Sequence, residues 1–174
     1  MNSHLIRTAI VTVSDTRTVD NDLSGDKLVE LLASIGADVG DRMIVTDDLM
    51  HLRETLHVLA ERDDINLILT TGGTGFGPRD NTPEATRGVI EREAPGLAEA
   101  MRRETAAKTP LSMLSRGICG IRGNTLIVNL PGQPRALREC LDAVFPAIPY
   151  CVDLIGGPYL TTNESKVVAF RPKK

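Results

Sequence analysis

The sequence predicts an α/β fold of three layers, in which helices cover both faces of a mostly parallel sheet. Short apolar segments alternate along the chain with segments whose apolar residues recur at helical spacing, and the connections between them are short. The segment at 65–70 is almost wholly apolar, which is typical of a buried parallel strand. The chain has 174 residues, so we expect a single domain over residues 1–174.

The first half of the chain contains three expected strands separated by two expected helices. The strands are the apolar segments at 5–14, 39–45 and 65–70. The first helix, at 26–34, has Leu28, Leu31 and Leu32 at helical spacing, and Gly36 is a suitable residue to end it. The second helix presents Leu49, Leu52, Leu56 and Leu59 on one face. Either Asp47 or Asp48 is expected to cap its first turn.

The second half begins with a glycine-rich loop and a short helix. Thr82 is expected to cap that helix, with Pro83 at its first position and Glu84 in its first turn. The segment 115–124 has the turn residues of a short hairpin that leads into a strand at 125–130. Pro131 and Gly132 turn the chain into a helix at 134–144, and a last strand is expected at 166–170, packed on the outside.

Charge and composition exclude several classes of function. The net charge of −3 argues against a protein that binds nucleic acid by bulk charge. No apolar run reaches the roughly 18 residues that span a bilayer, and the N-terminus lacks the features of a secretory signal, so we expect a cytoplasmic protein without a membrane partner. The cysteines Cys119, Cys140 and Cys151 indicate neither a disulfide framework nor a zinc site, and the histidines show no ligand spacing.

The strongest chemical signal is the glycine-rich loop at 72–80. Glycines after a buried strand allow backbone N–H groups to approach an anion closely, although a tight structural turn is the alternative. The loop is not a P-loop, because Pro78 and Arg79 stand where that motif requires Lys and Ser or Thr. It is not a dinucleotide fingerprint either, because Pro78 occupies the position of the last glycine.

Two aspartates stand at the expected ends of strands and loops. Asp47 follows the strand at 39–45, and Asp80 ends the glycine loop. If their strands are neighbours, both carboxylates face one crevice, because ligands of such sheets lie outside the carboxyl ends of the strands. Two carboxylates beside a phosphate site would repel it unless a cation such as Mg²⁺ lies between them. The alternatives are a helix cap for Asp47 and a loop hydrogen bond for Asp80.

Several arginines lie in expected loops or at the ends of elements. We expect at least one member of this group to bind an anion: Arg79, Arg116, Arg122 and Arg135. Arg102 and Arg103 resemble instead the solvated face of a helix.

Three segments together resemble the Mog/MoaB family of molybdenum cofactor synthesis, whose fold module also occurs in gephyrin. They are TTGGTGFGPRDNTPEAT, ETAAKTPLSMLSRGICGIRGNTLIVNLPGQP and IPYCVDLIGGPY, and the likeness runs from about residue 7 to residue 171. The resemblance implies a molybdopterin adenylyltransferase, which binds molybdopterin and Mg-ATP and joins AMP to the terminal phosphate of the pterin, with release of pyrophosphate. It also implies a homotrimer, with the hexamers of the MoaB branch as the alternative, and a hand-over of product to the molybdenum insertase.

The resemblance further implies roles for individual residues. Asp47 and Asp80 match the two essential carboxylates and, with them, the Mg²⁺ ligands. The remaining matches are the nucleotide-phosphate loop of Gly72, Gly73, Thr74 and Gly75, with Glu84 beyond it; the pterin-gripping pair Ser115 and Arg116; and the rim positions Ser14, Asp15, Ser24, Gly25, Asn129, Pro131 and Gly132. One departure is Thr46, where many members have proline. The alternatives to an enzyme are a non-catalytic molybdopterin carrier and an unrelated nucleotide-binding regulator.

Overall fold

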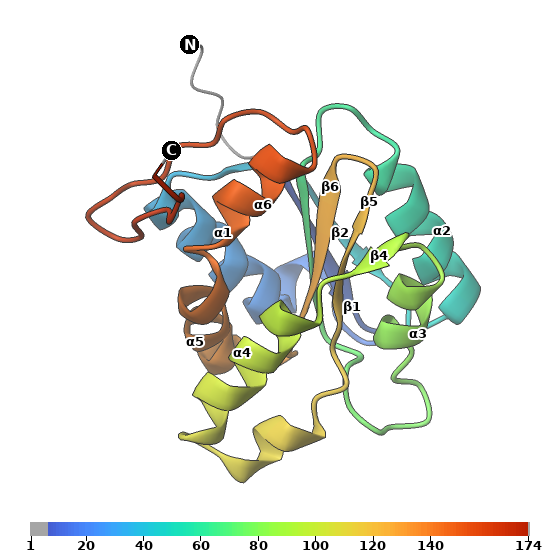
Figure 1. Cartoon of the computed structure of the whole chain (residues 1–174). Coiled ribbons are helices and arrows are strands. Elements are labelled where there is room, and N and C mark those ends of the chain that lie inside the picture. Colours follow the sequence, from blue (N-terminus) through green and yellow to red (C-terminus); the bar gives the residue numbers. More distant parts are fainter. Residues whose placement is uncertain (1–6, 174) are drawn as a thin grey trace.

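A six-stranded sheet lies between two layers of helices in the computed structural model, which describes residues 7–173 (Figure 1). The strand order is β2-β1-β3-β6-β5-β4. The parallel strands are β1 (Arg7–Val13), β2 (Asp38–Val45), β3 (Leu67–Thr71) and β6 (Thr125–Leu130), and the antiparallel edge consists of β5 (Cys119–Arg122) and β4 (Arg92–Glu93). The expected three-layer, mostly parallel sheet is confirmed; residues 5–6 of the first expected strand lie outside the described residues.

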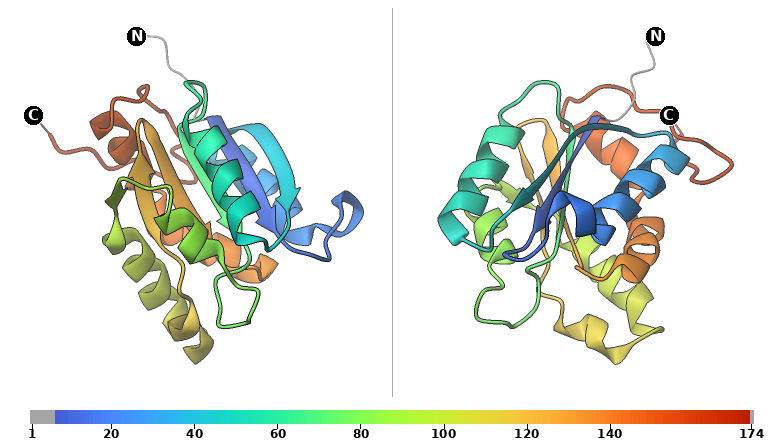
Figure 2. Two further views of the ribbon diagram at one scale, coloured as in Figure 1. Left: turned by 90° about the vertical axis from the view of Figure 1, so that its right-hand side faces the viewer. Right: turned by 180° about the vertical axis from the view of Figure 1, so that it is seen from behind.

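The helices divide between the two faces of the sheet (Figure 2). One face is covered by α1 (Leu23–Ile35), α4 (Pro95–Ala106), α5 (Pro134–Val144) and α6 (Ile148–Leu154), and the other by α2 (Leu49–Ala60) and α3 (Thr82–Arg87). Two 3₁₀ turns, η1 (Val19–Asn21) and η2 (Pro110–Leu114), lie in the connections. None of the described helices is long and apolar enough to cross a membrane.

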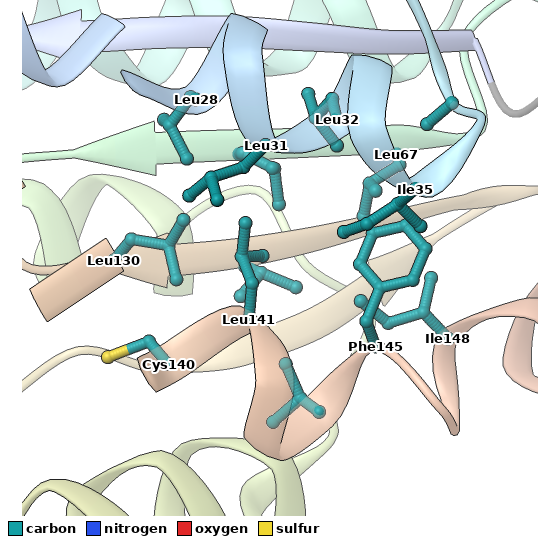
Figure 3. Close-up of a cluster of buried hydrophobic side chains, with 14 of the residues drawn as sticks. Leu28, Leu31, Leu32, Ile35, Leu67, Leu130, Cys140, Leu141, Phe145 and Ile148 are labelled. Carbon is teal, nitrogen blue, oxygen red and sulfur yellow. The ribbon is translucent and has the colours of Figure 1, made fainter. Parts of the chain in front are cut away.

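The central strands alternate their side chains between two cores. Ile10 and Leu69 face α1 and α5, whereas Val11 and Ile68 face α2. This period of two is what a strand buried on both faces requires. Figure 3 shows the larger core, in which leucines of α1 meet side chains of α5 and β6. Full burial of one leucine contributes about 1.5–3 kcal/mol, so these layers fix the positions of the strand ends.

The start of α1 depends on a buried carboxylate that sequence analysis did not identify. Asp22 is 1% exposed and accepts hydrogen bonds from the Gly25 N–H at 3.0 Å and from Thr12 Oγ1 at 2.9 Å. Arg42 Nη2 donates to the same side chain at 2.9 Å and compensates its charge. The loop between β1 and α1 is therefore held, where it enters α1, by side chains of β1 and β2. At the other end of α1, Gly36 adopts φ of 88° and ends the helix as expected.

The structure corrects two expected elements. Asn81 occupies the cap position of α3 and Thr82 is its first residue, because Thr82 Oγ1 donates to the Gly72 carbonyl at 2.9 Å instead of capping the helix. The segment 166–170 forms no strand. Val167 packs inward, but Val168 and Phe170 are 65% and 72% exposed, and the Phe170 N–H donates to Pro146 rather than to the sheet.

The expected hairpin is confirmed at its turn. β5 and β6 pair antiparallel with Arg122 opposite Thr125, and Gly123 between them has φ of 52°. Glycine adopts this left-handed conformation without a steric penalty. The hairpin adds β5 to the parallel sheet as an antiparallel strand. β6 then runs back to the edge of the sheet at which the other parallel strands end.

Candidate active site

Four parallel strands end at one edge of the sheet, and the loops that leave them are tied together there. Ser24 Oγ donates to the Gly132 carbonyl at 2.8 Å, and Thr71 Oγ1 donates to the Pro131 carbonyl at 2.8 Å. The loops after β1, β3 and β6 thus form one continuous rim. The strands that precede Asp47 and Asp80 are nevertheless not neighbours, because β1 lies between β2 and β3.

The glycine loop requires its glycines. Gly72 and Gly73 have φ of 100° and 66°. A Cβ atom on Gly72 would lie 2.6 Å from the Val13 carbonyl oxygen, and one on Gly73 would lie 2.3 Å from Thr82 Oγ1. Within residues 7–173, the N–H groups of Gly73, Thr74 and Gly75 donate to no protein acceptor. Unpaired N–H groups on a tightly curved loop are suited to an anion.

Arg116 braces this loop from the side. Its N–H donates to the Thr74 carbonyl, its Nε to the Gly75 carbonyl and its Nη2 to the Asp80 carbonyl, each at 2.8 Å. Its remaining terminal nitrogen pairs with Glu84, and this hydrogen bond lowers the pKa of the Glu84 carboxyl. The resemblance implies that Ser115 and Arg116 together grip the pterin and its phosphate, and this role stays a prediction; in the structure the guanidinium of Arg116 is engaged with the loop. The contacts therefore indicate a brace, which sequence analysis did not foresee.

The carboxylates of Asp47 and Asp80 both lie close to glycines of the loop. A Cβ atom on Gly73 would be 3.4 Å from Oδ1 of Asp47, and one on Gly75 would be 2.9 Å from Oδ2 of Asp80. Burial, followed by the negative charges of Asp15 and Asp80, raises the pKa of Asp47. A cation between the carboxylates would relieve that repulsion.

The alternative roles weighed for these two aspartates have different outcomes. Asp48, not Asp47, caps α2 by accepting from the His51 N–H at 2.8 Å, so the Asp47 side chain is not used as a cap. The expected loop hydrogen bond of Asp80 is present, since its Oδ2 accepts from the Gly77 N–H at 2.9 Å. Thr46, where many family members have proline, lies with its Oγ1 3.3 Å from Nδ1 of His51, so a side-chain contact restrains the approach to Asp47.

The carboxylates of the site fit a magnesium ion whose other ligands come from a bound substrate and water. Among residues 7–173 there is no cluster of three or more His, Cys, Asp and Glu side chains that would hold a metal. Mg²⁺ is commonly bound by one or two carboxylates together with substrate phosphates and water. Asp47 and Asp80 supply two carboxylates beside a loop with unpaired N–H groups, which is the protein's share of such a site.

The arginines expected to bind an anion are mostly engaged in ion pairs. Arg79 donates to both oxygens of Asp15, at 2.8 and 3.0 Å, and this pairing lowers the pKa of Asp15. Arg122 pairs with Glu61 at 2.6 Å. Arg135 makes no ion pair with a described carboxylate. Binding of an anion by one of these arginines stays a prediction.

A cavity of about 320 Å³ opens beside the glycine loop, between α4, η2 and α5. Its walls are mainly apolar, and Ser115 lies where the cavity meets Thr74 and Gly75. Arg102 from α4 also lines it and donates to the Ser115 and Gly117 carbonyls at 3.3 and 2.9 Å. The expectation that Arg102 belongs to a solvated helix face is therefore wrong, because its guanidinium holds the Ser115 segment; Arg103 is exposed as expected.

Several predicted rim residues use their side chains inside the protein. Asn129 is 2% exposed; its Oδ1 accepts from the Ile118 N–H and its Nδ2 donates to Thr70 and Thr86. Ser14 Oγ accepts from two N–H groups of its own loop. Gly25 lies directly against Asp22. Asn129, Ser14 and Gly25 therefore support the shape of the rim.

Comparisons with known proteins agree with this architecture. Residues 9–150 match the family described as "Probable molybdopterin binding domain". The chain is 43% identical over 173 residues to the molybdopterin adenylyltransferase of Helicobacter pylori strain J99, covering 97% of this chain and 98% of that protein. The molybdopterin biosynthesis enzyme MoaB of Thermus thermophilus is similar in structure, with a TM-score of 0.81, 44% identity, and coverage of 89% of this chain and 99% of that one.

The Mog protein of Mycobacterium ulcerans is also similar, with a TM-score of 0.79, 39% identity, and coverage of 87% and 98% of the two chains. The matched region includes the glycine loop, both aspartates, the Ser115 segment and the loop after β6. The chain therefore belongs to the molybdopterin-binding domain family of molybdenum cofactor biosynthesis.

Proposed function

We propose that this protein is a molybdopterin adenylyltransferase, which transfers AMP from ATP to the terminal phosphate of molybdopterin and releases pyrophosphate. The name of the Helicobacter pylori relative, which matches nearly the whole chain, supports this activity. The observation that carries the proposal is the position of two carboxylates close to the glycines of a loop with unpaired N–H groups.

In the proposed mechanism, the N–H groups of Gly73, Thr74 and Gly75 bind phosphate oxygens of ATP. Asp47 and Asp80 would hold Mg²⁺, which supplies neutralisation of the negative charge on the transferring group. The cavity beside Ser115 takes the pterin and directs its terminal phosphate toward the loop. An oxygen of that phosphate bonds to the α-phosphorus of ATP as the bond to pyrophosphate breaks. Such transfers depend chiefly on positioning and electrostatic stabilisation.

A non-catalytic molybdopterin carrier is the second candidate function, because a carrier requires the cavity but not the carboxylates. Membership of the family argues against the third, an unrelated nucleotide-binding regulator. Incubation with molybdopterin and Mg-ATP, followed by detection of adenylyl-molybdopterin and pyrophosphate, separates enzyme from carrier. The proposal predicts both products over many turnovers, whereas a carrier binds the pterin without consuming ATP.

The oligomeric state, the domain organisation, the location and the partner of the protein are also proposals. We propose a homotrimer, with a hexamer as the alternative, and light scattering of the purified protein measures which mass is present. A single domain over residues 1–174, a cytoplasmic location and hand-over of the product to the molybdenum insertase stay predictions. Transfer of labelled adenylyl-molybdopterin to purified insertase tests the last of these.

A further inference from the structure

We propose that Arg79 is a positioning residue for the transfer reaction: acting through Asp15, it fixes Asp47 relative to the glycine loop. The inference rests on the proposed function, because it explains what keeps Asp47 and Asp80, the two carboxylates proposed to hold Mg²⁺, in fixed relative positions. It concerns no contact between Arg79 and a substrate.

The topology creates the need for such a link. Asp47 follows β2 and Asp80 ends the loop after β3, and these two strands are separated by β1. No sheet hydrogen bond therefore connects the two carboxylate-bearing loops directly. The loop that leaves β1 lies between them, and the second residue of this loop is Asp15.

The contacts form a continuous chain across this edge. The Asp15 N–H donates to Asp47 Oδ2 and the Asp47 N–H donates to Asp15 Oδ1, both at 3.0 Å. Arg79 Nε and Nη2 donate to Asp15 Oδ2 and Oδ1 at 2.8 and 3.0 Å. Arg79 directly precedes Asp80 in the sequence. The Asp47 backbone is also held directly, because Asn81 Nδ2 donates to the Asp47 carbonyl at 3.1 Å. The Asp47 side chain, in contrast, is bound to the loop that carries Asp80 through the Asp15 residue that Arg79 holds.

Both the charge and the shape of the Arg79 side chain matter in this arrangement. Asp15 adds a third negative charge beside a site proposed to bind phosphates, and Arg79 is the described cation that hydrogen-bonds it. A guanidinium that donates two parallel hydrogen bonds also fixes the plane of the carboxylate, which a lysine ammonium does not do. With that plane fixed, Oδ1 of Asp15 stays directed at the Asp47 N–H.

The kinetic test uses Arg79→Ala, Asp15→Asn, the double variant and Arg79→Lys. We expect each single variant to lower kcat about ten- to a hundredfold, with a much smaller change in the KM for ATP, because misplacement of a catalytic group acts on the reacting geometry. The double variant is expected to be no slower than the slower single variant, since both remove one coupled unit. Arg79→Lys should not restore kcat. Arg87→Ala is the matched control, because Arg87 has the same 60% side-chain exposure and lies away from this contact chain.

Four kinetic results would overturn the proposal. A higher KM for ATP with unchanged kcat in Arg79→Ala would mean that Arg79 binds the nucleotide directly. Opposite effects of Arg79→Ala and Asp15→Asn would mean that only the local charge matters, as would full activity of Arg79→Lys. Multiplied losses in the double variant would mean that the two residues act independently.

A second measurement is independent of activity, so that failure of this proposal and of the proposed function are distinguishable. Amide hydrogen exchange followed by NMR should show faster exchange of the Asp15 and Asp47 N–H groups in Arg79→Ala, with unchanged exchange in the core of β1 and β3 and in Arg87→Ala. Unchanged exchange at both amides would overturn the positioning role even in an active enzyme. A wild-type protein that transfers no AMP would overturn the proposed function instead.

Discussion

The two halves of the candidate site are built by different means. The loop half, formed by Asp15, Asp47 and residues 72–80, is held by an ion pair and carboxylate hydrogen bonds across three loops, in addition to the Arg116 hydrogen bonds to its backbone carbonyls. The cavity half, formed by the Ser115 segment with α4 and α5, has mainly apolar walls and is held by hydrogen bonds to backbone carbonyls. The difference fits the proposed substrates, because phosphates require fixed charges and donors, whereas a ring system requires a shaped apolar space. Changes of charge should therefore affect turnover in the loop half, and changes of contact should affect affinity in the cavity half.

The largest effect is expected from Asp80→Asn in the loop half. The variant should fold normally and lose most turnover, about a hundredfold or more, because it removes one of the two carboxylates proposed to hold the Mg²⁺ that neutralises charge on the transferring group. The transfer rate at saturating Mg²⁺ and the circular dichroism spectrum measure the two parts. Asp63→Asn, on the exposed connection between α2 and β3, is the control for loss of a carboxylate. Wild-type activity of Asp80→Asn would contradict the role of the carboxylate pair.

Gly73→Val should separate the two halves by affinity. Its φ of 66° and the 2.3 Å approach of a Cβ atom to Thr82 Oγ1 mean that valine would distort the loop and block its N–H groups. Since each hydrogen bond to a charged group is worth about 1.5–3 kcal/mol, ATP affinity should fall at least tenfold and pterin affinity much less. Calorimetric titration with each ligand measures this, with Gly96→Ala, which has open space around it, as the control. Equal losses for both ligands with an intact fold would refute the division of the site.

Ser115→Ala makes the reciprocal test in the cavity half. Loss of one hydroxyl donor to a charged or polar oxygen should weaken pterin binding by about 1.5–3 kcal/mol and leave ATP affinity unchanged. The structural alternative is visible, since Ser115 Oγ accepts from the Gly117 N–H at 3.4 Å. If the melting temperature falls while pterin affinity is unchanged, Ser115 is structural and the pterin does not bind there.

The smallest effect concerns the thiol of Cys140 in the cavity wall. Burial raises the pKa of Cys140 to about 12, so the thiolate fraction stays negligible at physiological pH and at pH 9. Alkylation of Cys140 should be far slower in the folded protein than in denaturant at both pH 7 and pH 9, because a much smaller fraction of the thiol is ionised in the folded protein. Peptide mass spectrometry measures the extent. Rapid labelling of the folded protein would mean that the cavity wall is open and polar.

Most of the elements that the sequence predicts are those whose apolar residues recur with a clear period. β1, β3, β6, α1, α2 and α5 were expected within a few residues of their ends, because each buries large aliphatic side chains with a clear period. β2 was expected as well, although only Val45 of this strand is buried. α4 was not delimited, since its buried residues are Ala98, Met101 and Thr105, two of which are small or polar. The segment 166–170 carries a strand-like pattern, but no sheet edge is paired with it, and two of its apolar residues stay exposed.

The sequence predicted which residues lie near one another better than it predicted the contacts between them. The glycine loop, Asp47 and Asp80 follow from strand ends and turn chemistry, and the structure places them at one edge. The bridge by Asp15 depends on strand order, which a single sequence does not specify. The brace by Arg116 likewise depends on contacts between positions 32 to 42 residues apart, for which local patterns contain no signal.

Transfer of AMP at this edge of the sheet is the central claim, and isotope tracing tests it most directly. The protein is incubated with molybdopterin, Mg²⁺ and ATP labelled at either the α- or the γ-phosphorus, and the products are separated. The account predicts that the α label appears on the pterin and the γ label in pyrophosphate, in equal amounts. Pterin that binds without acquiring the α label, or that acquires the γ label, would contradict it.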